Sequence, residues 1–404
     1  MSWDTVKFNE LYAVDSKNGI YKSAENHGTG TKIVNMGELF AYGFIGGQDM
    51  RRIEVTDKEK ESFGVIEGDL LFARRSLVES GAGKSSIIKD LSEPTVFESS
   101  IIRVRLDKNK CNPLFYYYWL MSYDGRSEIS SLVNGVNVKG IKSSSLKDIT
   151  VAHPSMEIQN RIADILYHYD ELIENDQKQI KLLEEAAQRL YKEWFVDLRF
   201  PGYEETEFID EIPMGWNETT IDSFIELQSG YAFKSSSFDD AGNYKIVTIK
   251  NVQDGAFDGD NVNKILEIPD KMPPHCKLQE GDSLLSLTGN VGRVCTVIGD
   301  NYLLNQRVAK IVSEYPCFSY CLFRSDKMFH DMNNLANGAA QQNLSPIKTG
   351  QLRIIKPDDE MILKFEQMVK PILNKKNILN RDILIAAQAR NRLLPKLMNG
   401  EIEV

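Results

Sequence analysis

The stretch of sequence closest to a catalytic motif is glycine-rich, Ser80-Gly81-Ala82-Gly83-Lys84-Ser85. It resembles the end of a phosphate-binding loop, in which backbone N–H groups cradle a phosphate and a lysine neutralises its charge. The full pattern requires a glycine six residues before Lys84, where this chain has Val78. The stretch therefore predicts the flexible, basic tip of a hairpin rather than a nucleotide site.

Patterns for metal binding and for nucleophilic catalysis are also incomplete. Cys317 and Cys321 share a possible helix face, but no second cysteine or histidine pair completes a zinc set. No Gly-x-Ser-x-Gly elbow and no dinucleotide or methyl-donor loop occurs. The five scattered cysteines indicate free thiols in a reducing cytoplasm. We therefore expect a cytoplasmic, non-catalytic chain that binds no metal and no cofactor itself.

Several loops combine basic and amide side chains, and they occur at related places in the two halves of the chain. Arginine suits guanine edges and phosphates, while asparagine and glutamine suit adenine edges. These loops therefore favour DNA binding, although each one alone could be ordinary solvated surface. The candidate DNA-contacting residues are Arg74, Arg75, Ser76, Lys84, Asn134, Asn137 and Lys139 in the first half, and Thr288, Asn290, Arg293, Gln306, Arg307, Gln341, Gln342 and Asn343 in the second.

The formal net charge of −10 opposes tight DNA binding by the chain alone, because phosphate contacts need lysine and arginine. The acidic side chains are unevenly distributed, however. Residues 1–154 contain 20 acidic and 20 basic side chains, whereas residues 155–197 contain 10 and 5. This distribution permits DNA recognition with help from a partner and argues against an acidic DNA mimic. No apolar stretch is long enough to predict a membrane span.

The elements that would position these loops belong to an internal duplication. Lys32-Ile33-Val34 matches Lys245-Ile246-Val247 at a shift of 213 residues, and Glu67-Gly68-Asp69 matches Glu280-Gly281-Asp282 at the same shift. Further along each half, after an apparent deletion, the shift becomes 203. A collinear series of this kind indicates two copies of one structural unit.

Each half is predicted to begin with a globular module of short strands and short helices. Strands are expected at residues 63–66, 70–73, 96–106, 283–287 and 307–312, and a short buried helix at residues 113–121. The mixture of short strands with a buried aromatic helix is typical of an α+β module.

The strongest periodic signal is an apolar stripe near the end of each half. In both stripes the positions are spaced 4-3-4-4-3-4-3-4-3-4, which indicates a coiled-coil seam with a stutter at the doubled 4. A surface helix packed on its own module is the alternative. Pro371 is expected to kink or interrupt the second helix near its start. The apolar seam positions are Ile158, Ile162, Ile165, Ile173, Ile180, Leu183, Leu190 and Trp194 in the first stripe, and Met361, Phe365, Met368, Ile372, Leu379, Ile383, Leu393 and Leu397 in the second.

Three polar residues, Asp176, Lys376 and Arg390, also fall in the stripes and could fix the register of the helices. Which residues they pair with is not determined by the sequence. The whole pattern predicts a first module at residues 1–154, a long helix at 155–197, a linker at 198–214, a second module at 215–357, and a second long helix with its tail at 358–404.

Over essentially its whole length the chain resembles the specificity subunits of type I restriction–modification enzymes. The most specific part of the resemblance is Leu393-Leu394-Pro395-Lys396-Leu397-Met398-Asn399-Gly400-Glu401-Ile402, which matches a common ending of the second helix in that family. Pro154-Ser155-Met156-Glu157-Ile158-Gln159 resembles the start of the first helix, and Gln341-Gln342-Asn343-Leu344-Ser345 the end of a module. The start of the second helix, Pro357-Asp358-Asp359-Glu360-Met361, lacks the glutamine.

This resemblance implies an α+β protein in which two target-recognition domains alternate with two long helices, related by a pseudo-twofold repeat. The helices would pack as an antiparallel coiled coil that holds the domains apart. The implied function is recognition of a bipartite, asymmetric site in double-stranded DNA. The implied partners are two modification subunits, which methylate adenine, and restriction subunits, which translocate and cleave DNA.

By the same resemblance, S-adenosylmethionine, ATP and magnesium are expected on the partner subunits. Two other functions remain open at this point. One is a protein-interaction scaffold with a coiled-coil spacer that does not bind DNA, and the other is a fused methyltransferase or nuclease with unrecognised motifs.

Overall fold

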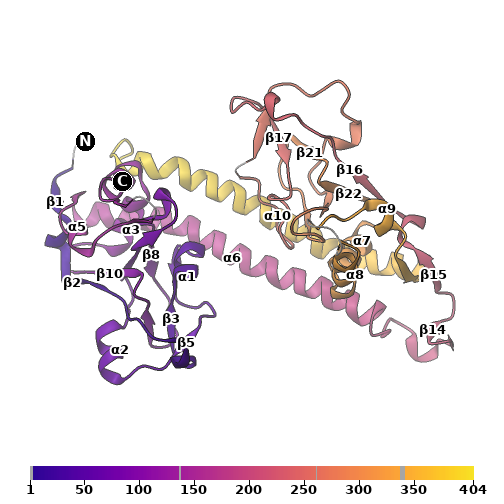
Figure 1. Ribbon diagram of the computed structural model, residues 1–404, viewed down its shortest axis with the longest axis horizontal. Helices are drawn as coiled ribbons and strands as arrows, with labels where there is room; N and C mark the ends of the chain where they lie inside the picture. The colour runs from indigo at the N-terminus through magenta and orange to yellow at the C-terminus, as the bar shows by residue number, and fades with distance from the viewer. Residues whose placement is uncertain (1–2, 136–137, 261, 337–341) are drawn as a thin grey trace. The chain divides into compact units, whose positions relative to one another are not determined.

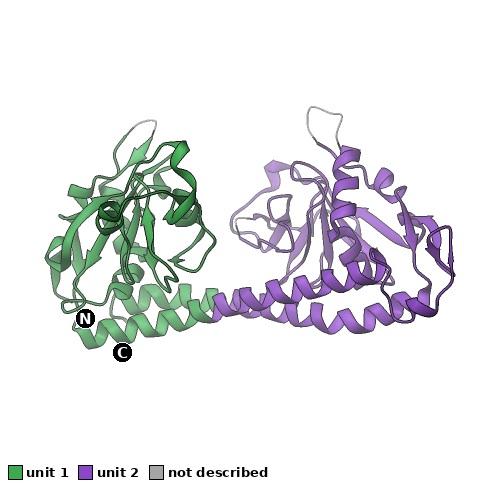
Figure 2. Ribbon diagram, turned by 90° about the horizontal axis from the view of Figure 1, so that it is seen from below, with its two compact units in different colours: residues 1–171, 386–404 green, residues 172–385 purple. Residues whose placement is uncertain are grey.

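The structure is a computed structural model that describes residues 3–135, 138–260, 262–336 and 342–404 (Figure 1). The chain forms two compact units, coloured separately in Figure 2. Unit 1 comprises Met1–Glu171 and Ala386–Val404, and unit 2 comprises Leu172–Ile385. The two long helices, α6 (Met156–Phe195) and α10 (Asp359–Met398), each contribute to both units. Each unit therefore consists of one globular module and a part of both helices.

The module of unit 1 is built on a five-stranded sheet with the order β2-β10-β6-β8-β4. A second sheet has the order β5-β3-β9, and β1 pairs with β12. The strands are β1 (Thr5–Lys7), β2 (Tyr12–Asn18), β3 (His27–Val34), β4 (Phe44–Ile45), β5 (Arg52–Ile53), β6 (Leu70–Ala73), β8 (Ser85–Ile88), β9 (Thr95–Phe97), β10 (Ile101–Leu106) and β12 (Thr150–Ala152). The α-helices are α1 (Met36–Ala41), α2 (Asp57–Phe63), α3 (Pro113–Met121), α4 (Tyr123–Ser131) and α5 (Ser143–Leu146).

The module of unit 2 repeats this plan. Its main sheet has the order β16-β22-β19-β20, its second sheet the order β18-β17-β21, and β15 pairs with β23. The strands are β15 (Asn217–Thr220), β16 (Ile225–Ser229), β17 (Tyr244–Val247), β18 (Asn263–Ile265), β19 (Ser283–Ser286), β20 (Val294–Thr296), β21 (Tyr302–Leu304), β22 (Val308–Ser313) and β23 (Arg353–Lys356). The α-helices are α7 (Pro316–Arg324), α8 (Asp326–Ala336) and α9 (Pro346–Gly350). Between the first long helix and this module lies the hairpin of β13 (Phe208–Ile209) and β14 (Ile212–Pro213).

The aromatic helix α3 forms where the sequence predicted it. Asn112 caps its first turn by accepting a hydrogen bond from Leu114 N at 2.9 Å, and Pro113 occupies the first position, where a missing N–H costs nothing. All residues from Phe115 to Leu120 are buried, so the central turns of the helix have no solvent face. Its apolar side chains join the sheet to the long helices in the core of unit 1.

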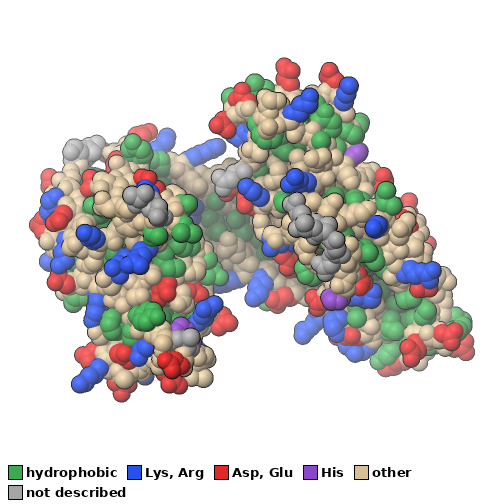
Figure 3. Space-filling model, in the orientation of Figure 1, with side chains coloured by type: hydrophobic (Ala, Val, Ile, Leu, Met, Phe, Trp, Pro, Cys, Tyr) green, Lys and Arg blue, Asp and Glu red, His purple; other side chains and the backbone are tan. Residues whose placement is uncertain are grey.

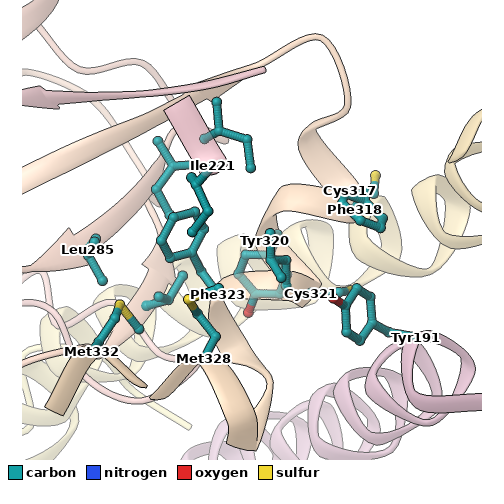
Figure 4. Packing of buried hydrophobic residues seen from close by; sticks show 14 of the residues in the cluster. Tyr191, Ile221, Leu285, Cys317, Phe318, Tyr320, Cys321, Phe323, Met328 and Met332 are labelled. Atoms are coloured by element: carbon teal, nitrogen blue, oxygen red, sulfur yellow. The ribbon is translucent and has the colours of Figure 1, made fainter. Parts of the chain in front are cut away.

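The equivalent helix α7 has the same role in unit 2. Figure 4 shows its residues Phe318, Tyr320 and Cys321 packed between the sheet and Tyr191 of α6. The ring centroids of Tyr191 and Phe318 are 5.6 Å apart. Burial of these rings removes a large apolar area from water and attaches the module to the helix pair.

The structure confirms the duplication for the long helices and most strands, although α1, α2 and β4 have no counterpart among the described residues of unit 2. Helices α6 and α10 are each 40 residues long, and their bounds differ by 203 at both ends. Strands β6 and β19 begin 213 residues apart, whereas β9 and β21, like β10 and β22, begin 207 apart. The shift between equivalent residues therefore falls first from 213 to 207 and then to 203. The value of 203 is reached at α3 and α7, before the long helices.

The long helices pack antiparallel, as predicted. In unit 1 the core contains Ile162 and Leu166 from the start of α6 together with Leu394 and Leu397 from the end of α10. In unit 2 the end of α6 packs against the start of α10, where the ring centroids of Trp194 and Phe365 are 5.9 Å apart.

The predicted stutter is wrong, because the seam uses different residues near the start of each helix. Met368 is 51% exposed, whereas its neighbour Val369 is fully buried. In α6 the seam position is the fully buried Gln159 rather than its half-buried neighbour Ile158. The Oε1 atom of Gln159 accepts a hydrogen bond from Asn112 N at 2.9 Å. The buried and half-buried positions then alternate between spacings of 3 and 4 without a doubled 4: Gln159, Ile162, Leu166, Tyr169, Ile173, Asp176, Ile180, Leu183, Ala187, Leu190 and Trp194 in α6, and Ile362, Phe365, Val369, Ile372, Lys376, Leu379, Ile383, Ala386, Arg390, Leu393 and Leu397 in α10.

Three local predictions also need correction. Residues 96–106 form two strands in different sheets, β9 and β10, because the chain turns between them. Residues 63–66 do not form a strand, since Phe63 ends helix α2, which a Thr56–Glu59 capping box begins. Helix α10 continues through Pro371 without interruption. Within the described residues, no helix has the length and apolarity needed to cross a membrane.

Candidate nucleic-acid interface

In unit 1 three of the predicted DNA-contacting residues, Arg75, Ser76 and Lys139, lie on a short strand pair at the end of β6. Strand β7 (Arg75–Ser76) pairs antiparallel with β11 (Lys139–Gly140), so that Lys139 lies opposite Ser76 and Gly140 opposite Arg75. Ile141 N extends the ladder by donating to the carbonyl of Arg74 at 3.0 Å. Residues that are far apart in sequence are therefore held together by backbone hydrogen bonds.

Unit 2 has the same hydrogen-bonded frame at the end of β19. Thr288 and Asn343 form an antiparallel bridge, and the carbonyl of Leu287 accepts a hydrogen bond from Leu344 N at 2.7 Å. At the shifts of 213 and 203, these contacts are the counterparts of Arg75–Gly140 and of Arg74–Ile141. The carbonyl of Gln342 also accepts from Gly289 N at 3.4 Å.

The remaining candidates lie beside this frame, again at equivalent places. Lys84 and Arg293 directly precede strands β8 and β20, and their carbonyls accept hydrogen bonds from Ala73 N at 2.8 Å and Ser286 N at 2.9 Å. The carbonyl of Arg307 accepts from Leu287 N at 2.9 Å. Its counterpart in unit 1 is Ser100, which was not selected from the sequence.

The side chains of unit 1 divide into exposed and inward-facing ones. Arg75, Lys84 and Asn134 are exposed. Arg74 is half-buried and donates to the carbonyl of Ser99 at 3.4 Å, while Lys84 donates to the carbonyl of Phe40 at 2.8 Å. Partial burial, together with the charge of Arg126, lowers the pKa of Lys84. The half-buried Ser76 and Lys139 lie opposite one another across the ladder.

In unit 2 most candidate side chains face solvent. The exposed residues are Asn290, Gln306, Arg307, Gln342 and Asn343. Arg293 is half-buried and donates to Oε1 of Gln253. The hydroxyl of Thr288 is buried and has no hydrogen-bond partner among the described residues. Asn137 and Gln341 lie outside the described residues.

The structure does not support a nucleotide site at the glycine-rich stretch. Gly83 and Lys84 lead into strand β8, whereas a phosphate-binding loop leads into a helix whose first N–H groups bind the phosphate. Nor does it support metal binding by the cysteines. All five are buried, and burial raises the pKa of both Cys111 and Cys295 to about 12. The described residues contain no cluster of side chains suited to a metal ion.

Figure 3 shows lysine and arginine side chains interspersed with acidic ones over the face that it presents. No single continuous basic area covers that face. The lysine and arginine side chains on this face are therefore dispersed positive charges rather than one extensive basic surface. Such an arrangement suits base recognition better than tight sequence-independent binding.

The duplicated frame agrees with what comparisons with known proteins show. The sequence model of the type I restriction modification DNA specificity domain matches residues 1–185 and 213–365, one match in each half. The chain belongs to this family. The family resemblance is thereby confirmed, and so is the predicted fold class of two α+β modules alternating with two long helices. The family match does not favour the scaffold without DNA binding.

Members of the specificity family with similar sequences include one archaeal and one bacterial protein. The MjaIX type I restriction enzyme specificity subunit of Methanocaldococcus jannaschii is 27% identical over 305 residues, which is 72% of this chain and 69% of that protein. The EcoBI specificity subunit of Escherichia coli is 22% identical over 335 residues, or 77% of this chain and 70% of that protein. The crystal structure of the type I restriction–modification S subunit from M. genitalium has the same fold, with a TM-score of 0.60 at 15% identity, covering 98% of this chain and 96% of that one.

The search of the sequence for charged and amide side chains missed the apolar residues next to them. Leu77 and Val138 follow and precede the paired strands β7 and β11, and both are exposed. The signal that could have identified them is an apolar residue directly after Arg75-Ser76, at a turn where a polar residue is the rule.

Proposed function

We propose that this chain is the DNA-recognition subunit of a type I restriction–modification complex, and that each unit recognises one part of a bipartite, asymmetric site. The observation that supports this function is the pair of equivalent frames at the ends of β6 and β19. Their backbone hydrogen bonds match, but their side chains differ, with Arg75 and Lys139 in one and Thr288 and Gln342 in the other. Two equal frames with unequal side chains suit a target with two different halves.

The proposal assigns the chemistry to partner subunits. Two modification subunits would methylate adenine and restriction subunits would translocate and cleave DNA, with S-adenosylmethionine, ATP and magnesium bound on those partners. This chain would remain non-catalytic and cytoplasmic. A net charge of −10 fits such a division, because partner subunits would make many of the phosphate contacts.

The test is to map methylated adenines in a host that expresses the chain with its modification subunit. We expect a split target with two specific halves. Arg75→Ala and Arg307→Ala should each relax specificity in a different half by about 1–3 kcal/mol, the contribution of a good base contact. Arg353→Ala serves as a control, since Arg353 is an exposed arginine on the strand pair β15–β23.

A split target that is unchanged in both arginine variants would contradict this assignment of residues. The absence of any split target, together with no specific duplex binding by the complex, would overturn the proposed function itself. Methyl transfer by the purified chain alone would show that it is a fused enzyme instead.

A further inference from the structure

Three apolar side chains extend into solvent at the free end of the β7–β11 ladder. Leu77 is 85% exposed, Val78 60% and Val138 49%. Leu77 directly follows Ser76 and Val138 directly precedes Lys139, so both adjoin the last pair of the ladder, Ser76 and Lys139. We call Leu77, Val78 and Val138 the apolar tip of unit 1.

The backbone of the apolar tip is held in place by hydrogen bonds. Val78 N donates to Ser76 Oγ at 3.1 Å, and the guanidinium of Arg126 donates to the carbonyls of Ser80 at 3.1 Å and Gly83 at 3.3 Å. A Cβ at Gly81 would collide with Ser76 Oγ, so the turn closes tightly behind the tip. The tip is therefore a preformed projection, and its exposed apolar surface is a feature that marks binding sites.

Two basic side chains adjoin the apolar tip and complement the negative charge of DNA, whereas the exposed Glu79 directly after Val78 is the acidic neighbour of the tip. Arg75 is exposed on strand β7 and lies two residues before Leu77. Lys139 adjoins Val138 on the opposite strand. Apolar side chains flanked by basic ones are what DNA recognition uses to contact thymine methyl groups or to wedge between base steps while neutralising phosphates.

Unit 2 has a different tip at the equivalent place. The counterpart of Leu77 is Asn290, which is exposed, and the counterpart of Val78 is Val291, which is buried. The two frames thus present different chemistry at the same position, a hydrogen-bonding amide in unit 2 and an apolar surface in unit 1. A partner protein that contacted both units in the same way would meet unlike surfaces here, whereas an asymmetric DNA site requires them.

We infer that the apolar tip packs against bases of the half-site that unit 1 recognises, with a thymine methyl group as its main contact. The inference rests on the proposed function and names residues that determine specificity within it. It predicts that one half-site contains a thymine whose methyl group matters, while the adenine to be methylated remains the task of the partner.

The experiment uses the full chain assembled with its modification subunit and synthetic duplexes of the mapped target. Each thymine of the target is replaced in turn by deoxyuridine, which removes only the methyl group. With the natural chain, we expect one replacement in one half-site to slow methylation roughly tenfold. The variant with both Leu77→Ser and Val78→Ser should methylate the two duplexes at equal rates, because it has lost the apolar contact.

Ile209→Ser is the matched control, because Ile209 is also 60% exposed but lies on the β13–β14 hairpin next to Asp210 and Glu211. The tip residues are solvent-exposed, so the unfolding midpoint of the double variant should equal that of the natural chain. The inference is overturned if no thymine methyl group matters, or if the double variant remains equally sensitive to deoxyuridine. It is also overturned if the double variant fails to assemble with the modification subunit, since the tip would then be a protein contact. If the natural complex methylates no split duplex, the proposed function fails first.

Discussion

The Nζ atom of Lys376 on α10 donates a hydrogen bond of 2.7 Å to the carboxylate of Glu184 on α6. The side chain of Lys376 is only 2% exposed, and its ammonium group also donates to the hydroxyl of Tyr320 on α7. Arg324, which is also on α7, donates to Glu184 at 2.7 Å. One carboxylate therefore joins both long helices to the module of unit 2.

Unit 1 contains a similar junction. Arg390 on α10 pairs with Asp170 on α6, and the hydroxyl of Tyr118 on α3 donates to Asp170 at 2.6 Å. The residue numbers of the pairs Glu184–Lys376 and Asp170–Arg390 both add to 560. The antiparallel register is therefore the same in the two units. Asp176 pairs with neither lysine nor arginine of the stripe; Asp382 lies near it instead.

Replacing Lys376 by methionine should lower the stability of unit 2 by about 3 kcal/mol, because it leaves a buried carboxylate with less compensation. Urea unfolding followed by tryptophan fluorescence measures this, since Trp194 and Trp216 lie in that core. The variant with both Lys376→Met and Glu184→Gln should recover part of the loss. If Glu184→Gln lowers the stability of the Lys376→Met variant as much as it lowers that of the natural chain, the two residues do not interact.

Val369→Ala should destabilise the chain by about 2 kcal/mol, whereas Met368→Ala should change stability by less than about 0.5 kcal/mol. The reason is that Val369 is in the seam and Met368 faces solvent. Thermal unfolding of both variants gives the comparison. Equal losses, or a larger loss for Met368→Ala, would restore the stutter.

Arg324→Lys should alter recognition by unit 2 without changing unit 1. Arg324 bridges Glu184 and Asp254, and the neighbouring Gln253 accepts the hydrogen bond of Arg293, which is a candidate DNA-contacting residue. A lysine keeps the charge but cannot bind both carboxylates, so Arg293 should lose its support. Methylation mapping should show relaxed specificity in one half-site only. Equal relaxation in both halves would mean a general loss of folding instead.

Acidification should weaken the Glu184 junction. Burial alone would raise the pKa of Glu184, but Lys376 and Arg324 outweigh it and lower the pKa below its ordinary value. Because the folded-state pKa is below the unfolded one, the stabilisation is complete above a pH of about 4.3 and is lost as pH falls through the folded-state pKa. The difference in urea midpoint between the natural chain and Glu184→Gln should therefore shrink below that pH. A difference that stays constant with pH would contradict this.

Asp176→Asn should have the opposite sign. Burial and the charge of Asp382 raise the pKa of Asp176, so its ionised form destabilises the fold at neutral pH. The amide should stabilise the chain at pH 7, and this gain should disappear as pH falls through the raised folded-state pKa of Asp176 and the carboxyl becomes protonated. Urea denaturation at pH 7 and at a pH below the folded-state pKa of Asp176 measures the effect. The substitution Asp57→Asn, at an exposed aspartate, is the control.

The sequence predicted the long helices well because a forty-residue stripe sums many weak preferences. It failed at the stutter because Ile158 and Met368 are apolar neighbours of the true seam positions Gln159 and Val369, and only burial distinguishes them. It could not predict that Glu184 is the partner of Lys376, since that pairing depends on the antiparallel register. For the candidate interface, residue types indicated the loops, but the pairing of Arg75 with Gly140 and of Thr288 with Asn343 could be found only from the backbone hydrogen bonds.

The matching frames at β6 and β19 are built from backbone N–H and C=O groups, which every residue except proline supplies in full. The exposed side chains of these frames, such as Arg75 and Asn343, therefore have little part in holding the frames together. Under the proposed function, a point substitution at an exposed position of either frame would change which base is preferred while the fold keeps its stability. The chain would thus acquire new targets by small mutational steps in one unit, with the other unit and the helix pair unaltered.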